Sequence, residues 1–292
     1  MKPFSYVACD SVEEACEALE AYAGDARVLA GGTDLLVELR RPGAVWPRAL
    51  VDVSRVGALW GVEERAGAVR VGPLATHAEA AASPVLRRAA PLLAAAAAAI
   101  GSPPIRHRGT VGGNVMNAAT CADTVPALVA LGARLTLQSA AGRRALPIAE
   151  FFVKPYVTVG RPDEVLTDIE FPALPADARS AFVKLGRRNA LAIARLSVAA
   201  VVRRGPDGRV VEARIVPGAA LPVWKRVTAA EALLVGEAPT PERLAAAGRQ
   251  VAEVMVGETG RRWSTEYKEP VVAALARRAL EACCAGPAGG AS

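Results

Sequence analysis

The chain has 292 residues, 52% of them hydrophobic, which is enough for a large core and, at roughly 150 residues per domain, for about two domains. Its 35 basic and 29 acidic residues give a formal charge of +6, and the arginines that dominate the basic set are spread along the whole sequence. Aromatic residues make up only 4%, whereas a nucleic-acid-binding protein usually concentrates its positive charge on one element among aromatic side chains, so the composition argues against that function.

The N-terminal third alternates between helix and strand patterns. The predicted elements are a helix at 10–23, a strand at 26–32, a helix at 33–43, a strand at 49–54, two strands within 58–75 joined by a turn at Gly67, and helices within 76–100 that break at Ser83-Pro84. Asp10 or Ser11 is the expected N-cap of the first helix, and Thr33 or Asp34 that of the second. A strand, a pair of glycines and a capped helix therefore follow one another directly.

The middle of the chain predicts a long loop and then a sheet. The loop runs to Asp123-Thr124, which cap a helix at 125–132 with Pro126 in its first turn. A hairpin follows at 133–148, and a strand at 164–172. Residues 173–180 are the predicted linker.

Beyond that linker the pattern changes to strands followed by helices. We expect strands at 181–188, 195–204 and 209–218, and helices at 227–235, 240–256 and 269–284. Three antiparallel strands followed by helices predict a separate α+β module.

The cysteines and histidines exclude several kinds of site. The five cysteines are irregularly spaced and form no CxxC pair, which argues against a disulfide framework and against an iron–sulfur or zinc site within this chain. With only His77 and His107, a histidine metal site or a Ser-His-Asp triad is not expected. His77 is interpreted as capping or flanking a helix, and His107 as a solvated loop residue.

The sequence shows no signal peptide and no apolar run of about 18 uncharged residues. We therefore expect a cytoplasmic protein, or one attached to a membrane only through its partners.

Two glycine-rich stretches, "LAGGTDLL" at 29–36 and "GTVGGNVMNAATCAD" at 109–123, carry little side-chain bulk. Backbone N–H groups can surround a phosphate where side chains do not intervene, and a helix N-terminus adds further donors. Neither stretch contains the GxGxxG or GxxxxGK[ST] pattern. A pyrophosphate site and a pair of tight turns both remain open at this point.

The same residues carry a specific resemblance. "VLAGGTDLL" and "GSPPIRHRGTVGGNVMNAATCADTVPALVALGARLTL" resemble the two flavin-binding signatures of the FAD-binding medium subunit of molybdenum hydroxylases, a family that includes the medium subunit of aerobic carbon monoxide dehydrogenase and the flavin domain of xanthine dehydrogenase. "EVLTDIEFP" and "AFVKLGRRNALAIA" resemble later landmarks of that family. The resemblance covers about residues 4–284 in the same order.

The resemblance implies an α+β fold with two domains. Residues 1–174 would form a two-lobed FAD-binding domain of the PCMH type, with lobes at about 1–54 and 55–174. Residues 178–284 would form a smaller C-terminal domain of a three-stranded antiparallel sheet plus helices. Residues 285–292 would be a flexible tail.

The resemblance also implies the site. The FAD pyrophosphate would lie on two loops, formed by Val28, Leu29, Ala30, Gly31, Gly32, Thr33 and Asp34 and by Thr110, Val111, Gly112, Gly113 and Asn114. Asn117 and Asp123 would follow the ribityl and ribose groups, Ile100 would line the adenine end, and Leu166, Lys184 and Ile193 would approach the isoalloxazine ring. Asp34 is also assigned to helix capping, because a carboxylate repels a diphosphate. Cys121, where the family often has a different residue, is interpreted as a neutral replacement; a thiol close to the flavin is the alternative.

The implied function is that of an electron-transfer flavoprotein subunit. It would take electrons from the 2Fe–2S clusters of a small partner subunit, which receives them from the molybdopterin cofactor of a large partner, and pass them to NAD, a quinone or oxygen. We expect a dimer of heterotrimers, and neither a catalytic residue nor a metal ligand in this chain. Two alternatives are a self-sufficient FAD-dependent oxidoreductase of the same fold, which should show catalytic residues in the C-terminal module, and a non-catalytic assembly subunit, which should have lost the glycine loops.

Overall fold

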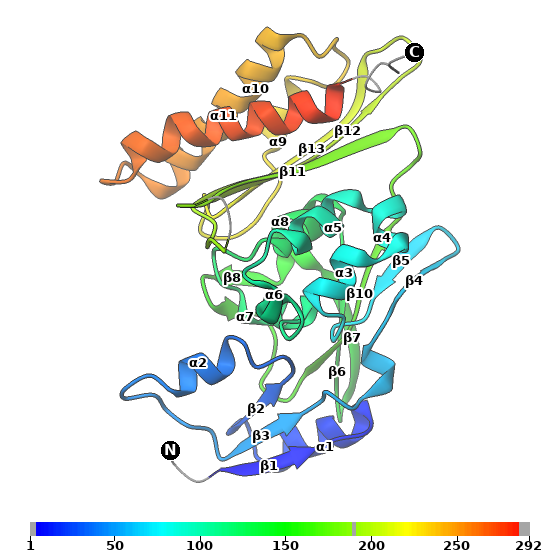
Figure 1. Cartoon of the computed structure of the whole chain (residues 1–292), viewed down its shortest axis with the longest axis vertical. Helices are drawn as coiled ribbons and strands as arrows, with labels where there is room; N and C mark the ends of the chain where they lie inside the picture. Colours follow the sequence, from blue (N-terminus) through cyan, green and yellow to red (C-terminus); the bar gives the residue numbers. More distant parts are fainter. Residues whose placement is uncertain (1–3, 189–190, 286–292) are drawn as a thin grey trace.

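The computed structural model describes residues 4–188 and 191–285. Three bodies follow one another in chain order (Figure 1): an N-terminal lobe at the bottom, a central lobe of sheet and short helices, and a C-terminal sheet covered by two long helices. The predicted flexible tail at 285–292 lies, apart from Ala285, outside the described residues.

The N-terminal lobe is a small parallel sheet of three strands. In the sequence, one helix precedes the second strand and another helix follows it. Its elements are β1 (Ser5–Ala8), α1 (Val12–Ala21), β2 (Ala26–Leu29), α2 (Leu35–Leu39) and β3 (Ala49–Asp52), with strand order β1-β3-β2. The Ser11 hydroxyl caps α1 by accepting a hydrogen bond from the N–H of Glu14. Strand β1 has no counterpart among the predicted elements.

Helix α2 is shorter than the predicted helix at 33–43. It ends at Leu39, since the residue before Pro42 is disfavoured in helical geometry and Gly43 has a φ of +77°. Asp34 occupies the N-cap position, but its side chain makes no capping hydrogen bond. The predicted capping role of Asp34 is therefore wrong for its carboxylate.

The central lobe is a five-stranded antiparallel sheet with helices on one side. The strands are β4 (Val62–Arg65), β5 (Ala68–Val71), β6 (Arg134–Ser139), β7 (Gly142–Pro147) and β10 (Val165–Pro172), in the order β4-β5-β10-β6-β7. The helices are α3 (His77–Ala82), α4 (Pro84–Ala89), α5 (Pro91–Ala98), α6 (Pro103–Arg106), α7 (Val111–Asn117) and α8 (Thr124–Ala130). Two 3₁₀ turns, η1 (Gly57–Leu59) and η2 (Ile148–Glu150), and a small ribbon of β8 (Phe152–Lys154) and β9 (Val157–Thr158) complete the lobe.

Two local expectations in this lobe need correction. The helical region at 76–100 breaks a second time at Ala90, because Pro91 starts a new helix there. The stretch expected to be a loop up to residue 123 contains helices α6 and α7, and α7 is capped by the Thr110 hydroxyl, which accepts from the N–H of Gly113. The glycine-rich stretch is thus partly helical despite its composition.

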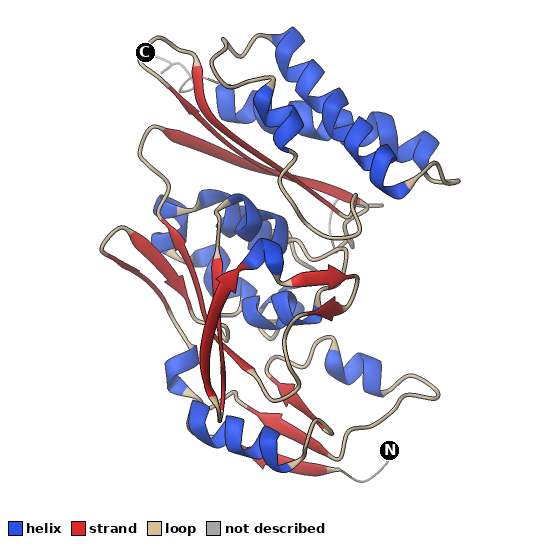
Figure 2. Cartoon of the chain, turned by 180° about the vertical axis from the view of Figure 1, so that it is seen from behind, coloured by secondary structure: helices blue, strands red, loops and turns tan. Residues whose placement is uncertain are grey.

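The C-terminal body contains the three predicted strands and the three predicted helices, but β11 begins at Ala178, inside the predicted linker at 173–180, and ends at Leu185, three residues before the predicted end. It contains β11 (Ala178–Leu185), β12 (Leu196–Arg204) and β13 (Val210–Gly218) in one antiparallel sheet, followed by α9 (Thr228–Ala232), α10 (Pro241–Thr259) and α11 (Thr265–Cys284). Helices α10 and α11 lie along the outer face of the sheet (Figure 2).

Strand β12 is buried on both faces, which explains the uninterrupted apolar run at 198–202 within it. Val198 and Ala200 belong to the core formed with α10 and α11, whereas Ala199 and Val201 belong to the core of the central lobe. The C-terminal sheet is therefore packed against the central lobe. Within the described residues, no helix combines the length and the hydropathy that a membrane crossing requires.

Candidate functional site

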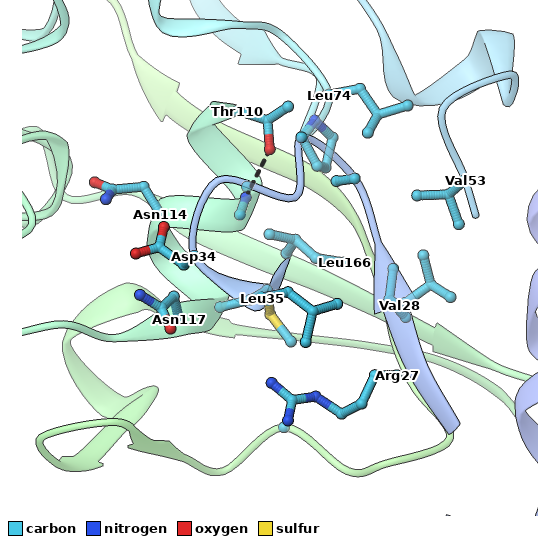
Figure 3. Close-up of a pocket in the computed structure, with 18 of the residues that line it drawn as sticks. Arg27, Val28, Asp34, Leu35, Val53, Leu74, Thr110, Asn114, Asn117 and Leu166 are labelled. Atoms are coloured by element: carbon cyan, nitrogen blue, oxygen red, sulfur yellow. Dashed lines mark hydrogen bonds between the residues drawn. The ribbon is translucent and has the colours of Figure 1, made fainter. Parts of the chain in front are cut away.

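A cavity of about 410 Å³ lies between the N-terminal and central lobes (Figure 3). Its lining comes from four parts of the chain: 24–35, 53–77, 110–117 and 160–166. Of the predicted site residues, those that line it are Val28, Ala30, Gly31, Gly32, Thr33, Asp34, Thr110, Gly112, Gly113, Asn114, Asn117 and Leu166. The tertiary fold therefore brings both glycine-rich stretches to one cavity.

The glycines of the two stretches are required first by packing. A β-carbon at Gly31 would lie 1.9 Å from the carbonyl oxygen of Arg108, and one at Gly112 would lie 2.7 Å from the carbonyl oxygen of Pro73. Gly32 has a φ of +72°, which side chains rarely adopt. The first stretch thus lies directly against the chain that leads into the second, with no room for a side chain between them.

The first stretch offers free hydrogen-bond donors. In the described part of the chain, the backbone N–H groups of Gly31, Gly32, Thr33 and Asp34 donate to no other group. These residues face the cavity and precede α2. A run of unpaired amides beside a cavity is the arrangement that binds an anion such as a phosphate.

The second stretch differs from its predicted chemistry. The N–H of Val111 donates to Ala75, that of Gly112 to Pro73, that of Gly113 to the Thr110 hydroxyl and that of Asn114 to the Thr110 carbonyl. The expectation of free amides there is wrong, because the start of α7 is tied to the segment before α3. Residues 110–114 can contact a ligand through their side chains and, at Gly113, through backbone that carries no side chain.

Polar side chains gather on one side of the cavity. In Figure 3, Asp34, Asn114 and Asn117 lie together, and Val28 and Val53 lie on the opposite side. The Thr124 hydroxyl donates to Oδ1 of Asn114 at 2.7 Å, which leaves the amide NH₂ of Asn114 free to donate to a ligand. Partial burial and then the nearby Glu38 raise the pKa of Asp34. The cavity therefore has a hydrogen-bonding side and an aliphatic side.

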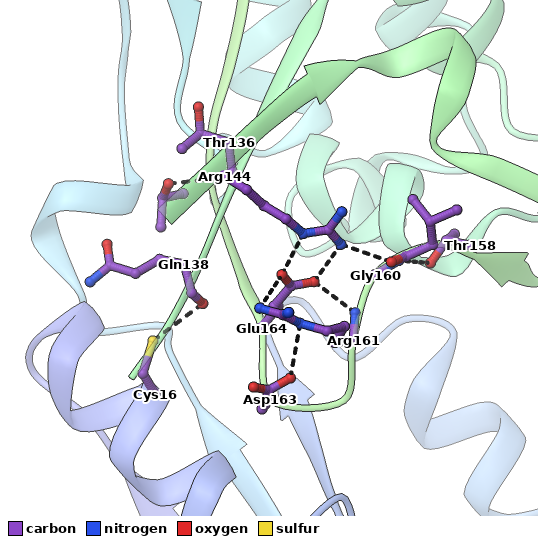
Figure 4. A network of polar contacts seen from close by, with 11 residues as sticks. Cys16, Thr136, Gln138, Arg144, Thr158, Gly160, Arg161, Asp163 and Glu164 are labelled. Atoms are coloured by element: carbon purple, nitrogen blue, oxygen red, sulfur yellow. Dashed lines mark hydrogen bonds and ion pairs between the residues drawn. The ribbon is translucent and has the colours of Figure 1, made fainter. Parts of the chain in front are cut away.

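The segment 160–166 was not predicted apart from Leu166. Glu164, whose side chain is buried, accepts hydrogen bonds from Arg144 Nε at 2.6 Å and from the backbone N–H of Arg161 at 2.7 Å (Figure 4). Although burial opposes ionisation, these hydrogen bonds hold the pKa of Glu164 below its ordinary value. The network fixes the turn that carries Gly160 and Pro162 to the cavity. A Gly-Arg-Pro turn just before a strand is the only sequence signal for it.

His77 also lines the cavity and was interpreted only as a residue at a helix start. It is the first residue of α3, directly after the N-cap Thr76, which confirms that interpretation. Its side chain is 3% exposed, and its Nδ1 is buried without a partner among the described residues. Burial and then the charge of Arg106 lower the pKa of His77 to about 4, so its ring is neutral at pH 7.

Six predicted site residues do not line this cavity: Leu29, Ile100, Val111, Asp123, Lys184 and Ile193. Val111 is fully buried in the core of the central lobe, and the side chain of Ile193 is 76% exposed.

Asp123 and Lys184 form an ion pair away from the cavity. Lys184 Nζ lies 2.5 Å from Asp123 Oδ2 and 2.9 Å from the carbonyl oxygen of Ala99. Burial raises the pKa of Asp123 to about 6 in spite of the lysine, and its Oδ1 is buried with no partner in the described chain. The pair joins β11 to the start of α8, so the predicted helix-capping role of Asp123 is replaced by an ionic contact between the C-terminal sheet and the central lobe.

Cys121 lies close to this pair, and burial and then Asp123 raise the pKa of its thiol. Such a thiol is mainly protonated at neutral pH. In the described residues, no group of three or more His, Cys, Asp or Glu side chains is placed to hold a metal ion.

Comparison with known proteins gives matches along nearly the whole chain. Residues 2–174 match the family of the FAD binding domain in molybdopterin dehydrogenase, and residues 180–283 match the CO dehydrogenase flavoprotein C-terminal domain. The nicotine 6-hydroxylase medium subunit of Paenarthrobacter nicotinovorans is 33% identical over 94% of this chain and 95% of its own length.

Further relatives are named after other compounds. A putative xanthine dehydrogenase FAD-binding subunit of Escherichia coli is 30% identical over 90% of each chain. In the solved structures, a chain of carbon monoxide dehydrogenase from Hydrogenophaga pseudoflava superimposes with a TM-score of 0.90 at 32% identity, covering 97% of this chain and 98% of that one.

Proposed function

We propose that this chain, which belongs to the family of FAD-binding medium subunits of molybdenum-containing hydroxylases and dehydrogenases, holds FAD between its two N-terminal lobes and passes electrons from a partner subunit to an external acceptor. It is an oxidoreductase subunit with FAD as its cofactor. The observation that carries the proposed site is the run of four unpaired amides at 31–34, facing a cavity between the lobes.

The residues present fit such a cofactor. The cavity of about 410 Å³ falls within the range of roughly 300–1,000 Å³ typical of small-molecule sites. Donors for a pyrophosphate lie on the first stretch, and the amide of Asn114 adds one from the second. Val28, Val53 and Leu166 supply an apolar surface for a ring.

This chain's own contribution is binding and orientation. The flavin supplies the electron chemistry when it is bound. The Gly31–Asp34 amides and the side-chain amide of Asn114 would hold the diphosphate in place, and Asn117 would fix the sugar chain beside it. The buried, neutral ring of His77 and the aliphatic side chains of the lining would help to exclude water from the cavity.

For the residues away from the cavity, the predicted contacts with FAD remain proposals. Asp123 would follow the ribityl and ribose groups of a cofactor longer than the cavity, since a short loop joins it to Asn117, and Lys184 beside it would approach the isoalloxazine ring. Ile193 would approach the ring. Because Lys184 Nζ donates to the carbonyl oxygen of Ala99, Ile100 lies close to Lys184, so the adenine end for Ile100 and the ring for Lys184 cannot both hold for an extended FAD. Leu29 and Val111 would not contact FAD with their side chains. They would contribute only by holding the backbone of the two glycine-rich stretches in place.

The partners and the acceptor belong to this proposal as well. Relatives are named as medium subunits or chains, which supports a complex with a small iron–sulfur subunit and a large molybdopterin subunit. Medium or FAD-binding subunits of the same family carry the names of different compounds, namely nicotine, xanthine and carbon monoxide. This variety supports a substrate site on the large partner, outside this chain. NAD, a quinone or oxygen as acceptor, a dimer of heterotrimers and a cytoplasmic location stay predictions.

We also propose the domain division at 1–174 and 178–284. It is supported by the two family matches, which meet between residues 174 and 180, and by the start of β11 at Ala178.

A visible absorption spectrum of the purified chain tests the proposal directly. After incubation with FAD and desalting, we expect retained flavin bands at about one FAD per chain and no turnover of nicotine, xanthine or carbon monoxide by the chain alone. The complex purified with its partners should retain the same bands and reduce an acceptor dye. Absence of flavin from both preparations, or substrate turnover by the isolated chain, would contradict the proposal.

A further inference from the structure

A cluster of cations without carboxylate partners lies at one end of the C-terminal sheet. Arg195 precedes β12, and Arg262 and Lys268 flank the start of α11. Within the described residues, none of the three has an Asp or Glu oxygen within 4.0 Å, and the remaining residues of the chain include no Asp or Glu. Arg262 Nε donates to the carbonyl oxygen of Thr259, and Lys268 Nζ to that of Ala219. Backbone contacts hold the two cations in place but leave their charge uncompensated.

The three cations are close enough to repel one another. Burial lowers the pKa of Lys268, and the charges of Arg195 and Arg262 lower it further. The adjacent Arg261 has its own partner, Glu269, at 3.0 Å. The exposed Glu266 lies on the same turn of α11. Even with both carboxylates counted, the four basic groups leave this end of the sheet positive.

Exposed aromatic side chains lie among these cations. The guanidinium of Arg195 lies 5.5 Å from the ring centre of Tyr267, which is 47% exposed, and Trp263 between Arg262 and α11 is 91% exposed. We name Arg195, Arg262, Trp263, Tyr267 and Lys268 the basic–aromatic patch. Leu191 and Ile193, on the loop before Arg195, add exposed aliphatic side chains.

The patch is continuous with the flavin-binding part of the molecule. The N–H of Arg195 donates to the carbonyl oxygen of Leu185, the residue after Lys184, and Lys184 pairs with Asp123 of the central lobe. In Figure 1 the end of β11, the start of β12 and the start of α11 lie at the left end of the sheet, and Arg195 contacts Tyr267 of α11 there. A molecule seated on the patch therefore also lies next to the junction between the C-terminal sheet and the flavin domain.

We propose that the basic–aromatic patch is the docking surface for an acidic face of a protein partner, namely the subunit that exchanges electrons with the flavin. Trp, Tyr and Arg are the residues that dominate protein–protein binding energy, and unpaired cations select a partner surface of opposite charge. The inference rests on the proposed function, because it takes the partner to be a redox subunit.

Co-purification with the native partners tests the patch. The tagged full-length chain is expressed in the organism that encodes it, and iron, molybdenum and FAD are measured per chain after purification at about 150 mM salt. In the R195E/R262E variant we expect iron and molybdenum per chain to fall at least tenfold, with FAD retained and an unchanged melting temperature. The W263A variant should lower assembly in the same direction without changing any charge.

The matched control is R249E/R278E, which reverses two exposed arginines of α10 and α11 outside the patch. It should keep the iron and molybdenum content of the wild type. Wild-type metal content in R195E/R262E, or equal loss in the control, overturns the patch as an interface. If the wild-type complex contains FAD but no iron, the proposed redox partner is wrong and this inference falls with it.

Other anionic partners give a different result. The isolated chain is mixed with a single-stranded oligonucleotide and with phosphatidylserine vesicles at the same salt concentration. We expect neither to bind. Binding that R195E/R262E abolishes, together with unchanged metal content of the complex, overturns a protein partner in favour of nucleic acid or membrane.

Discussion

The carbonyl oxygen of Arg108 occupies the space that a side chain on Gly31 would need, since a β-carbon at Gly31 would lie 1.9 Å from it. This contact sets the first glycine stretch against the chain leading into the second. One wall of the cavity therefore depends on the absence of a single methyl group.

Replacing Gly31 by alanine should disrupt the site through packing. We expect G31A to lower the free energy of unfolding by about 2–3 kcal/mol, by forcing the two stretches apart, and to abolish FAD binding. Thermal unfolding and flavin content check this. G57A is the control, since a β-carbon at Gly57 meets nothing within 4 Å. A G31A chain with wild-type stability and flavin content would show that the two stretches are free to separate.

Removing the charge of Asp34 should strengthen FAD binding. Its carboxylate lies beside the free amides at 31–33, where it would repel the diphosphate of a bound FAD. We expect D34N to lower the Kd for FAD about three- to tenfold, with a larger gain at low salt. Because the pKa of Asp34 is raised, wild-type affinity should also increase as the pH falls through that pKa, while D34N should not change.

Fluorescence titration with FAD from pH 4.5 to 8 measures this effect. E17Q, which removes an exposed carboxylate on α1, controls for net charge alone. Weaker binding in D34N would mean that the carboxylate accepts a hydrogen bond from the ligand and does not repel it.

Breaking the Asp123–Lys184 pair from one side should cost more than removing both charges. K184M leaves the buried carboxylate without its partner, and we expect a loss of about 3 kcal/mol in the free energy of unfolding. The double variant D123N/K184M should recover a large part of that loss. Urea unfolding of both variants tests this, with K154M at an exposed lysine as control. Additive losses in the double variant would show that the two side chains are not coupled.

His77 should make the protein less stable in mild acid. Its pKa is lowered to about 4 in the folded chain, against about 6.5 in the unfolded chain, so the unfolded state binds the extra proton between these values. The stabilising contribution is complete above about pH 6.5 and is lost as the pH falls toward 4, to a limit of about 3 kcal/mol.

The raised pKa of Asp123 has the opposite effect on how stability changes with pH. The folded chain holds a proton there up to about pH 6, so this group lowers stability as the pH rises from about 4 to 6. In the wild type the two contributions largely offset each other between about pH 4 and 6. The H77N variant should therefore gain stability relative to the wild type as the pH falls from about 6.5 to 4, whereas H107N, at an exposed histidine, should follow the wild-type profile. Melting temperatures from pH 4 to 7.5 decide the point; parallel profiles of H77N and the wild type would show that His77 does not titrate in this range.

Much of this protein could be predicted from local sequence. The strands β12 and β13, the helices α10 and α11 and the glycine pair that ends β2 follow from periodicity, capping residues and turn residues, which act over a few positions. Twelve of the eighteen residues that the family resemblance implied for the site also line one cavity. The position of these twelve residues at one cavity agrees with the resemblance, whereas their contact with FAD stays a prediction.

The rest was decided by contacts between segments far apart in the chain. The second glycine stretch became a helix with its amides already bonded, because Pro73 and Ala75 lie against it. His77 and the Glu164 turn reached the cavity, and Asp123 turned from its helix to Lys184, 61 residues away. No local pattern encodes such choices, since they depend on which buried polar group finds its partner once the sheets have packed, and the free energy of that pairing exists only in the assembled fold.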